Sequence, residues 1–313
     1  MQNQSSVSIV IPFFNESEGI LDLLSKIGDY HNRRKFEFDI LFVDDGSTDG
    51  TTELIKSVQS IPYPCKIISL SKNYGSHAAV RAGFLHSTGN LVTCLPADLQ
   101  ISFDTVEILY AKSIQGFDVV NAVREINNIG LFEKIFSRFY SSMMRRYVHK
   151  DFPDKGIETV LINDKVRRNF NLNIESNSSF VLQILSMGFK STFVDIEKTN
   201  RKIGKSKWTL SKKIKLLIDS FVSFSFAPIR FVSLMGICFF IIGFIWTIYI
   251  ITRKLIFDDL ASGWPTLMSI LMIGFGVTNI SLGIIAEYLW RTLDTSRKRP
   301  VFIIDEIIEL NQP

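Results

Sequence analysis

Cysteine is scarce in this chain, and the three cysteines that it has lie far apart. Cys65, Cys94 and Cys238 are odd in number and have neither the spacing of a metal site nor that of a disulfide framework. We therefore expect buried, reduced thiols. A strong excess of one charge is also missing, because the net charge is only +4 over 313 residues. This balance gives no reason to expect a nucleic acid partner.

A recognisable signal peptide is missing as well. Residues 1–6 are polar, and the first apolar run, Val7 to Phe14, has the length of a strand and is interrupted by Pro12. We expect the N-terminal domain to remain in the cytoplasm. Internal repeats and low-complexity segments are also lacking, so no repeat architecture is predicted.

Apolar, β-branched segments alternate with segments of helical periodicity in the first part of the chain. The expected strands are 7–12, 39–43, 65–70 and 91–95, and the expected helices between them are 20–27, 48–57 and 76–87. A further helix and strand are expected between 104 and 123. This alternation predicts an α/β fold with a doubly wound, Rossmann-like nucleotide-binding sheet.

Polar clusters follow the expected strands, and we expect them to meet at one rim, where such sheets bind ligands. They are Asn15-Glu16, Asp44 to Ser47, 73–77 and Ala97 to Gln100. A carboxylate after the second strand can accept an N–H group of a nucleobase. A carboxylate and an amide oxygen after the fourth strand can hold a divalent cation against a diphosphate, since hard cations prefer oxygen ligands. Ordinary turn and capping chemistry would explain Asp44 to Ser47 equally well.

The last third of the chain contains two uncharged runs that predict a membrane anchor. Residues 231–252 and 260–286 are each long enough to cross a bilayer as a helix. Basic residues cluster at 201–215 and 291–299, outside this hairpin, so the catalytic domain and the C-terminus are expected in the cytoplasm. Leu210 to Phe226 has one apolar and one basic face and is expected to lie among the lipids of the membrane interface.

These patterns divide the chain into four regions. We expect a catalytic domain at 1–208, an interfacial amphipathic helix at 209–230, a transmembrane hairpin at 231–289 and a cytoplasmic tail at 290–313. Within the first region, 129–147 carries a broad apolar stripe that fits a core helix and an interfacial helix equally well. The acidic end of the tail predicts no element.

Several motifs together give the chain a family resemblance. They are VSIVIPFFNES, ILFVDDGSTDGT, LSKNYGSHAAVRAGF, PADLQ, RKIGKSKWTL, SFSFAPIR and AEYLWRTLDTSRKRP. Through them nearly the whole chain resembles the inverting family 2 glycosyltransferases of the GT-A fold, and among these the polyprenyl-phosphate sugar transferases. The resemblance implies transfer of a sugar (EC 2.4 class) from a nucleotide sugar, with a UDP-sugar favoured, to undecaprenyl or dolichol phosphate. It also implies a bacterial inner-membrane location and a possible homo-oligomer.

Carried over residue by residue, the resemblance implies a complete site. A nucleotide pocket would be formed by Pro12, Phe14, Glu16, Val43, Asp45 and Ala97, and a Mg²⁺ or Mn²⁺ ion and the diphosphate would be held by Ala97, Asp98 and Gln100. Arg124 and Arg138 would lie near the phosphates or the acceptor. Arg201 and Lys207 would belong to a basic loop that closes over the diphosphate. Positive charge in that loop would stabilise the departing nucleoside diphosphate. The same basic stretch also fits a solvated segment beside anionic lipid.

The expected acceptor makes a general base unnecessary. A polyprenyl phosphate is already an anion, so catalysis reduces to positioning the substrates and neutralising the leaving group. His77, early in an expected helix, is accordingly expected to be structural or to lie near the phosphates instead of acting as a base.

The chain departs from the family pattern at two places. Pro96 stands where the family usually has the first Asp of D-x-D-L-Q, so one metal or ribose contact is lost. After Pro153 the family pattern D-x-G-D-F-R-L is replaced by DKGIETV, in which Glu158 is new. A transferase acting on a hydroxyl of a lipid-linked glycan would need a base, and Asp154 or Glu158 could supply it. A membrane-anchored pseudoenzyme with a weakened metal site is the third hypothesis.

Overall fold

The computed structural model describes residues 6–58, 60–124, 138, 140–146, 149–150, 152–154, 156–173, 179–196, 263–296 and 300–310, with scattered positions between 234 and 256. Its elements are β1 (Val7–Phe13), α1 (Ile20–Arg33), β2 (Phe38–Asp44), α2 (Thr51–Ser57), β3 (Cys65–Leu70), α3 (Ser76–His86), β4 (Leu91–Cys94), α4 (Asp104–Ser113), β5 (Val119–Arg124), β6 (Ile157–Asn163), α6 (Asp164–Leu172), α7 (Phe180–Ser186), β7 (Ser191–Ile196), α10 (Trp264–Ser296) and β8 (Ile304–Glu309). The chain forms two compact units, one of Met1–Ser220 with Pro300–Pro313 and one of Phe221–Arg299.

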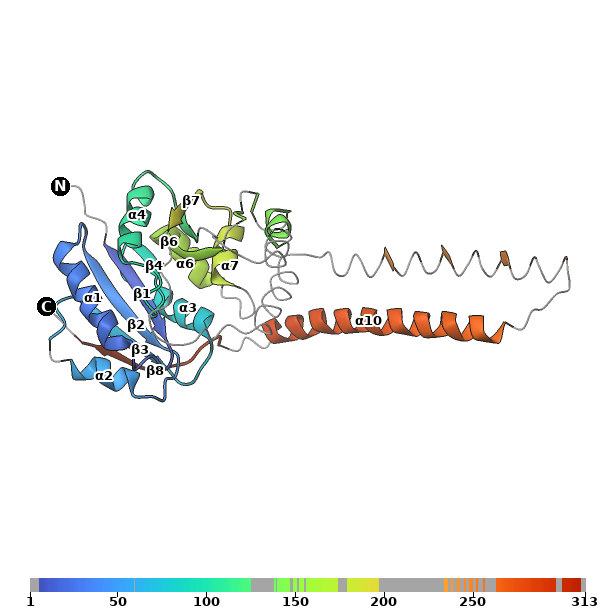
Figure 1. Ribbon diagram of the computed structural model, residues 1–313, viewed down its shortest axis with the longest axis horizontal. Helices are drawn as coiled ribbons and strands as arrows, with labels where there is room; N and C mark the ends of the chain where they lie inside the picture. Colours follow the sequence, from blue (N-terminus) through green and yellow to red (C-terminus); the bar gives the residue numbers. More distant parts are fainter. Residues whose placement is uncertain are drawn as a thin grey trace. The chain divides into compact units, whose positions relative to one another are not determined.

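The first unit is built on one mixed sheet of eight strands in the order β7-β5-β6-β4-β1-β2-β3-β8 (Figure 1). β1 pairs in parallel with β2 and β4, and β2 pairs in parallel with β3. β6 runs antiparallel between β4 and β5, so β5 is parallel to the central strands. The carboxyl ends of β1, β2, β4 and β5 therefore lie at the same rim as the amino end of β6.

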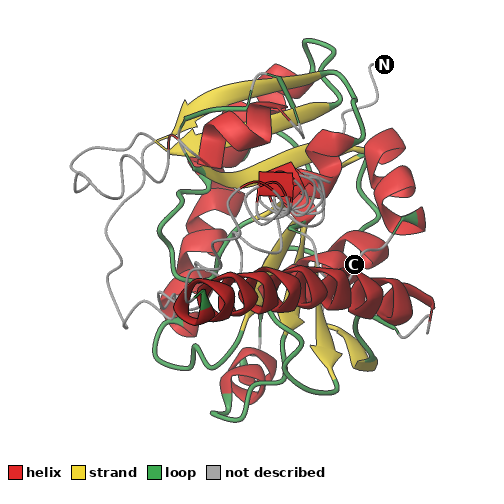
Figure 2. Cartoon of the chain, turned by 90° about the vertical axis from the view of Figure 1, so that its right-hand side faces the viewer, coloured by secondary structure: helices red, strands yellow, loops and turns green. Residues whose placement is uncertain are grey.

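The side chains of β1 alternate between the two faces of the sheet, and each face is covered by a packed layer. Ile9 and Ile11 belong to a buried apolar cluster that includes residues of α1 and α4. Val10 points the other way, toward α3, where a Cβ added to Gly83 would lie 2.2 Å from Val10 Cγ1. Figure 2 shows helices on both sides of the strands. The predicted α/β fold is thereby confirmed.

The helices differ from their predicted bounds for local reasons. α1 continues to Arg33, beyond the predicted 20–27, because Tyr30 extends its buried stripe and stacks on Phe103 at 5.6 Å between ring centroids. α2 begins at Thr51 instead of residue 48, since Gly50 before it has a left-handed φ of 82°. The third strand matches its prediction, Cys65–Leu70.

The C-terminal tail forms a strand that was not expected from the sequence. β8 pairs antiparallel with β3 and so becomes an edge of the sheet. The Ser71 N–H donates to Ile303 O at 3.0 Å and the Leu310 N–H donates to Cys65 O at 3.1 Å, which extends the ladder at both ends. Residues 300–310 thus belong to the same unit as the other strands of the sheet.

The second unit contains α10, which overlaps the expected span at 260–286. The other expected span, 231–252, is described only at scattered positions. Within the described ranges, no helix combines the length and the apolar character that crossing a bilayer requires. The expected interfacial helix at 210–226 lies outside the described residues. Of 129–147, residues 138, 140–146 are helical, and Met143 and Met144 are buried there.

Candidate active site

The residues expected to bind the nucleotide are brought together at the carboxyl rim of the sheet. Pro12 and Val43 are register partners in β1 and β2. Asp45 follows β2 directly, and its N–H donates to Phe13 O at 2.9 Å. Ala97 follows β4, where the Leu95 N–H donates to Val10 O at 2.9 Å. Strand pairing therefore gathers segments that are up to 85 residues apart in the sequence.

Hydrogen bonds between side chains and backbone N–H groups hold the loops after β1 and β2 together. The Asn15 N–H donates to Ser47 Oγ at 3.0 Å, and the Thr48 N–H donates to Asn15 Oδ1 at 2.8 Å. Asn15 has φ of 50°, a left-handed conformation that asparagine tolerates better than most residues. The Glu16 N–H donates to Thr51 Oγ1 at 3.0 Å. This double loop presents Phe14 and Glu16 on a supported backbone.

The two adjacent aspartates after β2 have different surroundings. Asp44 accepts hydrogen bonds from the Ser47 N–H at 2.8 Å and from the Thr52 hydroxyl, so it organises its own loop and α2. Asp45 accepts from the Tyr74 N–H at 2.7 Å and from the Gly75 N–H at 2.9 Å, at the start of α3. Burial raises the pKa of Asp45, and these N–H groups partly offset that rise.

Gly46 allows this close approach of the β2 and β3 loops. Its φ is 74°, and an added Cβ would lie 2.6 Å from the backbone carbon of Lys72. Any other residue would push the two loops apart. The positions of Asp45 and of the turn before α3 are thus coupled.

The segment after β4 presents two oxygen-bearing side chains from a tight turn. The Gln100 N–H donates to Asp98 Oδ1 at 3.2 Å. Leu99 between them has φ of 58°, which costs about 1–2 kcal/mol for a residue other than glycine. Its side chain packs against the buried apolar cluster, which offsets that strain. The turn keeps Asp98 and Gln100 partly exposed while Ala97 is buried.

Arg124 ends β5 beside the residue that is new in this chain, Glu158. Arg124 Nε and Glu158 Oε1 are 3.6 Å apart, and the Arg124 N–H donates to Gly156 O at 3.0 Å. Asp154 forms an ion pair with Arg145 at 2.8 Å. Both candidate bases therefore lie beside arginines. Sequence reasoning missed the pair of Arg124 with Glu158, because these residues are 34 positions apart and meet only through the pairing of β5 with β6.

Arg138, Arg201 and Lys207 are the remaining basic residues of the expected site. Arg138 is an exposed helical residue. Arg201 and Lys207 lie outside the described residues, so their expected role as a closing loop stays a prediction. His77 lies on the first turn of α3, with its ring 5.5 Å from that of Phe180. Burial, together with Arg81 nearby, lowers the pKa of His77 to about 4, which makes it a poor base near pH 7.

Asp98 and Gln100 fit a cation that shares its ligands with a substrate. Their oxygens suit a hard cation such as Mg²⁺, which commonly binds through one or two carboxylates together with phosphates and water. In the part of the chain that the structure describes, no group of three His, Cys, Asp or Glu side chains could enclose a metal by itself. A metal at this turn would depend on the diphosphate.

Comparison with known proteins identifies the family of the chain. Residues 8–172 match the family described as Glycosyl transferase family 2, and residues 227–291 match the GtrB C-terminal hairpin. The chain is 30% identical to the uncharacterized glycosyltransferase YkcC of Bacillus subtilis over 98% of its length and 95% of the relative. It is also 30% identical, over 98% of its length and 95% of the relative, to an undecaprenyl-phosphate 4-deoxy-4-formamido-L-arabinose transferase of Edwardsiella ictaluri.

Solved structures show more distant similarity. A mannosyltransferase of Pyrobaculum calidifontis in complex with GDP-Man and Mn²⁺ is 15% identical, with a TM-score of 0.47, over 64% of this chain and 58% of that one. From the family match over more than half of its residues and from its full-length relatives, the chain is a glycosyltransferase that belongs to family 2, carries the GtrB C-terminal hairpin and is related to the undecaprenyl-phosphate sugar transferases.

Proposed function

We propose that this glycosyltransferase moves a sugar from a nucleotide sugar, a UDP-sugar in the first instance, to a polyprenyl phosphate at the cytoplasmic face of a bacterial inner membrane. The observation that carries the choice of acceptor is that both candidate bases, Asp154 and Glu158, lie in ion pairs with arginines. A sugar hydroxyl needs a base to accept its proton, whereas a phosphate anion needs none. The full-length relatives named as undecaprenyl-phosphate transferases support the same acceptor.

We further propose the roles of the rim residues. Pro12, Phe14, Glu16, Val43, Asp45 and Ala97 bind the nucleotide. Asp98 and Gln100 hold a divalent cation, Mg²⁺ or Mn²⁺, which when bound supplies positive charge to the diphosphate. Arg124, with Arg138, Arg201 and Lys207, supplies further positive charge around the phosphates as the nucleoside diphosphate departs. Orientation of the two anions by these groups provides the rest of the catalysis.

The chain topology supports a membrane anchor with two spans. The chain leaves the first unit after residue 220 and returns to it at residue 300, where β8 joins the sheet. A membrane segment between these points must cross the bilayer an even number of times. Two spans at 231–252 and 260–286 meet this requirement and keep the catalytic domain and the tail on the same, cytoplasmic side.

A panel of nucleotide sugars incubated with the purified protein and undecaprenyl phosphate tests the proposed function. We expect mass spectrometry to find a lipid in which the sugar is linked to the phosphate. A product formed only from a lipid-linked oligosaccharide would instead support transfer to a glycan hydroxyl and overturn the proposed acceptor.

A further inference from the structure

The antiparallel pairing of β4 with β6 carries Glu158 toward the segment that follows β4. The ladder pairs Leu91 with Asn163, Val92 with Ile162 and Thr93 with Leu161. Continued by three residues beyond its last pair, this register would bring Pro96 opposite Glu158. Contacts beyond the ladder support the continuation, because the Thr159 hydroxyl donates to Cys94 O and lies 3.5 Å from Cys94 Sγ.

A bulge in β6 sets Glu158 apart from its neighbours. Ala122 of β5 pairs with Thr159, but the next residue, Val123, pairs with Ile157. Glu158 is therefore the extra residue and has no register partner in β5. Bulges bend a strand and redirect a side chain, and they are common beside active sites.

The Glu158 carboxylate is held at the rim of the sheet. Its side chain is only 19% exposed and lies beside the Arg124 guanidinium, with 3.6 Å between Oε1 and Nε. Burying a carboxylate is unfavourable without such a partner. The pair sets one negative and one positive group side by side at the end of β5, which suits a cation and a diphosphate bound together.

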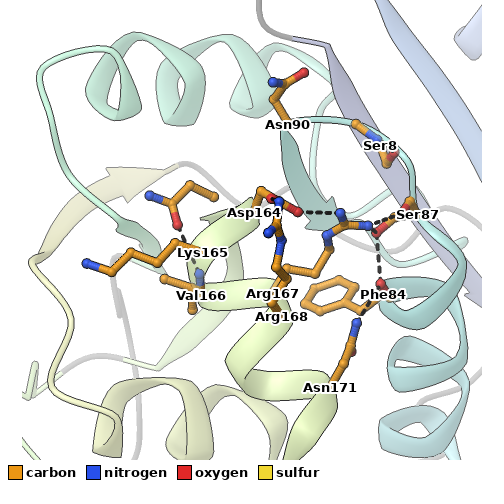
Figure 3. A network of polar contacts seen from close by, with 12 residues as sticks. Ser8, Phe84, Ser87, Asn90, Asp164, Lys165, Val166, Arg167, Arg168 and Asn171 are labelled. Atoms are coloured by element: carbon orange, nitrogen blue, oxygen red, sulfur yellow. Dashed lines mark hydrogen bonds and ion pairs between the residues drawn. The ribbon is translucent and has the colours of Figure 1, made fainter.

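The register that creates this juxtaposition is anchored at the opposite end of the strands (Figure 3). Arg167 of α6 donates to Ser87 O, just after α3, and also contacts Asp164. The Asp164 N–H donates to Asn90 O at 3.0 Å, where β4 begins. A slip of β6 by one residue would break these contacts and turn its side chains to the other face.

From this geometry we propose that Glu158 contributes the carboxylate that Pro96 cannot, binding the divalent cation directly or through one water molecule. The proposal rests on the proposed function, because it concerns the same cation and diphosphate. Glu158 then serves as a metal-binding residue that compensates for the missing first Asp of D-x-D-L-Q, not as a general base.

Binding of Mn²⁺ to the full-length protein in detergent, with UDP present, tests this proposal by the loss of the free Mn²⁺ electron paramagnetic resonance signal. We expect Glu158→Gln to weaken Mn²⁺ binding about tenfold or more, as loss of a supporting metal contact does. The matched control is Asp154→Asn, which also loses an ion pair with an arginine but should bind Mn²⁺ as the wild type does. Pro96→Asp added to Glu158→Gln should restore most of the affinity.

The possible outcomes separate the two proposals. Wild-type Mn²⁺ affinity in Glu158→Gln, or no recovery on adding Pro96→Asp to a variant that melts normally, would overturn the role of Glu158. Loss of Mn²⁺ binding in Asp98→Asn would still support the proposed site in either case. A wild-type protein that shows no metal-dependent UDP binding would overturn the proposed function itself.

Discussion

The Asp45 carboxylate accepts a hydrogen bond from the Gly75 N–H at 2.9 Å and so joins the end of β2 to the start of α3. The same carboxylate accepts from the Tyr74 N–H. One side chain therefore shapes the rim where the nucleotide is proposed to bind. Changes at Asp45 should affect both the stability of the fold and the affinity for nucleotide.

Asp45→Asn should lower stability by about 1–3 kcal/mol, because the partly buried N–H groups of Tyr74 and Gly75 lose a charged acceptor, and it should also weaken UDP binding. Asp44→Asn is the matched control. It removes an equally buried carboxylate that serves the Ser47 loop and α2, so it should lower stability while UDP affinity remains. Melting curves and UDP titrations measure the two effects. Equal losses of UDP affinity in both variants would contradict the assignment of Asp45.

Asp98→Ala should abolish sugar transfer and leave membrane insertion intact. Asp98 is partly exposed on the turn after β4, so its loss removes a proposed metal contact without opening the core. Turnover by the purified variant and its recovery in the membrane fraction measure the two effects. A wild-type rate in this variant would refute the metal assignment.

β8 should stabilise the sheet more through Ile308 than through Ile307. Ile308 pairs with the buried Ile67 of β3 and is itself partly buried, whereas its neighbour Ile307 is 44% exposed. Ile308→Thr should therefore lower stability by about 1 kcal/mol more than Ile307→Thr, since Ile308 has more of its apolar surface buried. Thermal melting of the two variants compares them directly, and equal melting temperatures would show that β8 does not pack as described.

Acidification should destabilise the protein through His77. In the folded chain its pKa is lowered to about 4 by burial and by Arg81, whereas the unfolded chain protonates histidine near pH 6.5. Between these values the unfolded state binds the extra proton. The contribution of His77 to stability is therefore full above pH 6.5 and is lost as the pH falls toward 4. Between pH 7.5 and pH 5, the melting temperature of the wild type should fall more steeply than that of His77→Asn. Equal slopes in the two proteins would contradict this mechanism.

Much of the fold and of the candidate site follows from local patterns in the sequence. The apolar runs of β1, β2, β3 and β4 identify strands, and the polar residues after them identify a ligand-binding rim, because parallel strands end together. Asp98 and Gln100 could be chosen in this way, whereas Asp45 was distinguished from Asp44 by the family resemblance. Helix ends were less predictable, since a single residue such as Gly50 decides where α2 can begin.

Other features depend on contacts between distant parts of the chain. The edge strand β8 has no pattern of its own to identify it, and it forms only because β3 offers an open edge. Arg124 and Glu158 become neighbours through the pairing of β5 with β6, and the bulge at Glu158 depends on the register of both partners.

The sequence by itself determined the α/β layer, its rim of polar residues, the two apolar runs and the family to which the chain belongs. The first three are local properties of residue type and spacing, whereas the family follows from the resemblance of several motifs taken together. Only the tertiary structure decided that Asp45 holds the start of α3, that the tail returns to the sheet, and that Glu158 lies beside Arg124. Those relationships arise from strand register and backbone hydrogen bonds between distant segments, which no local pattern encodes.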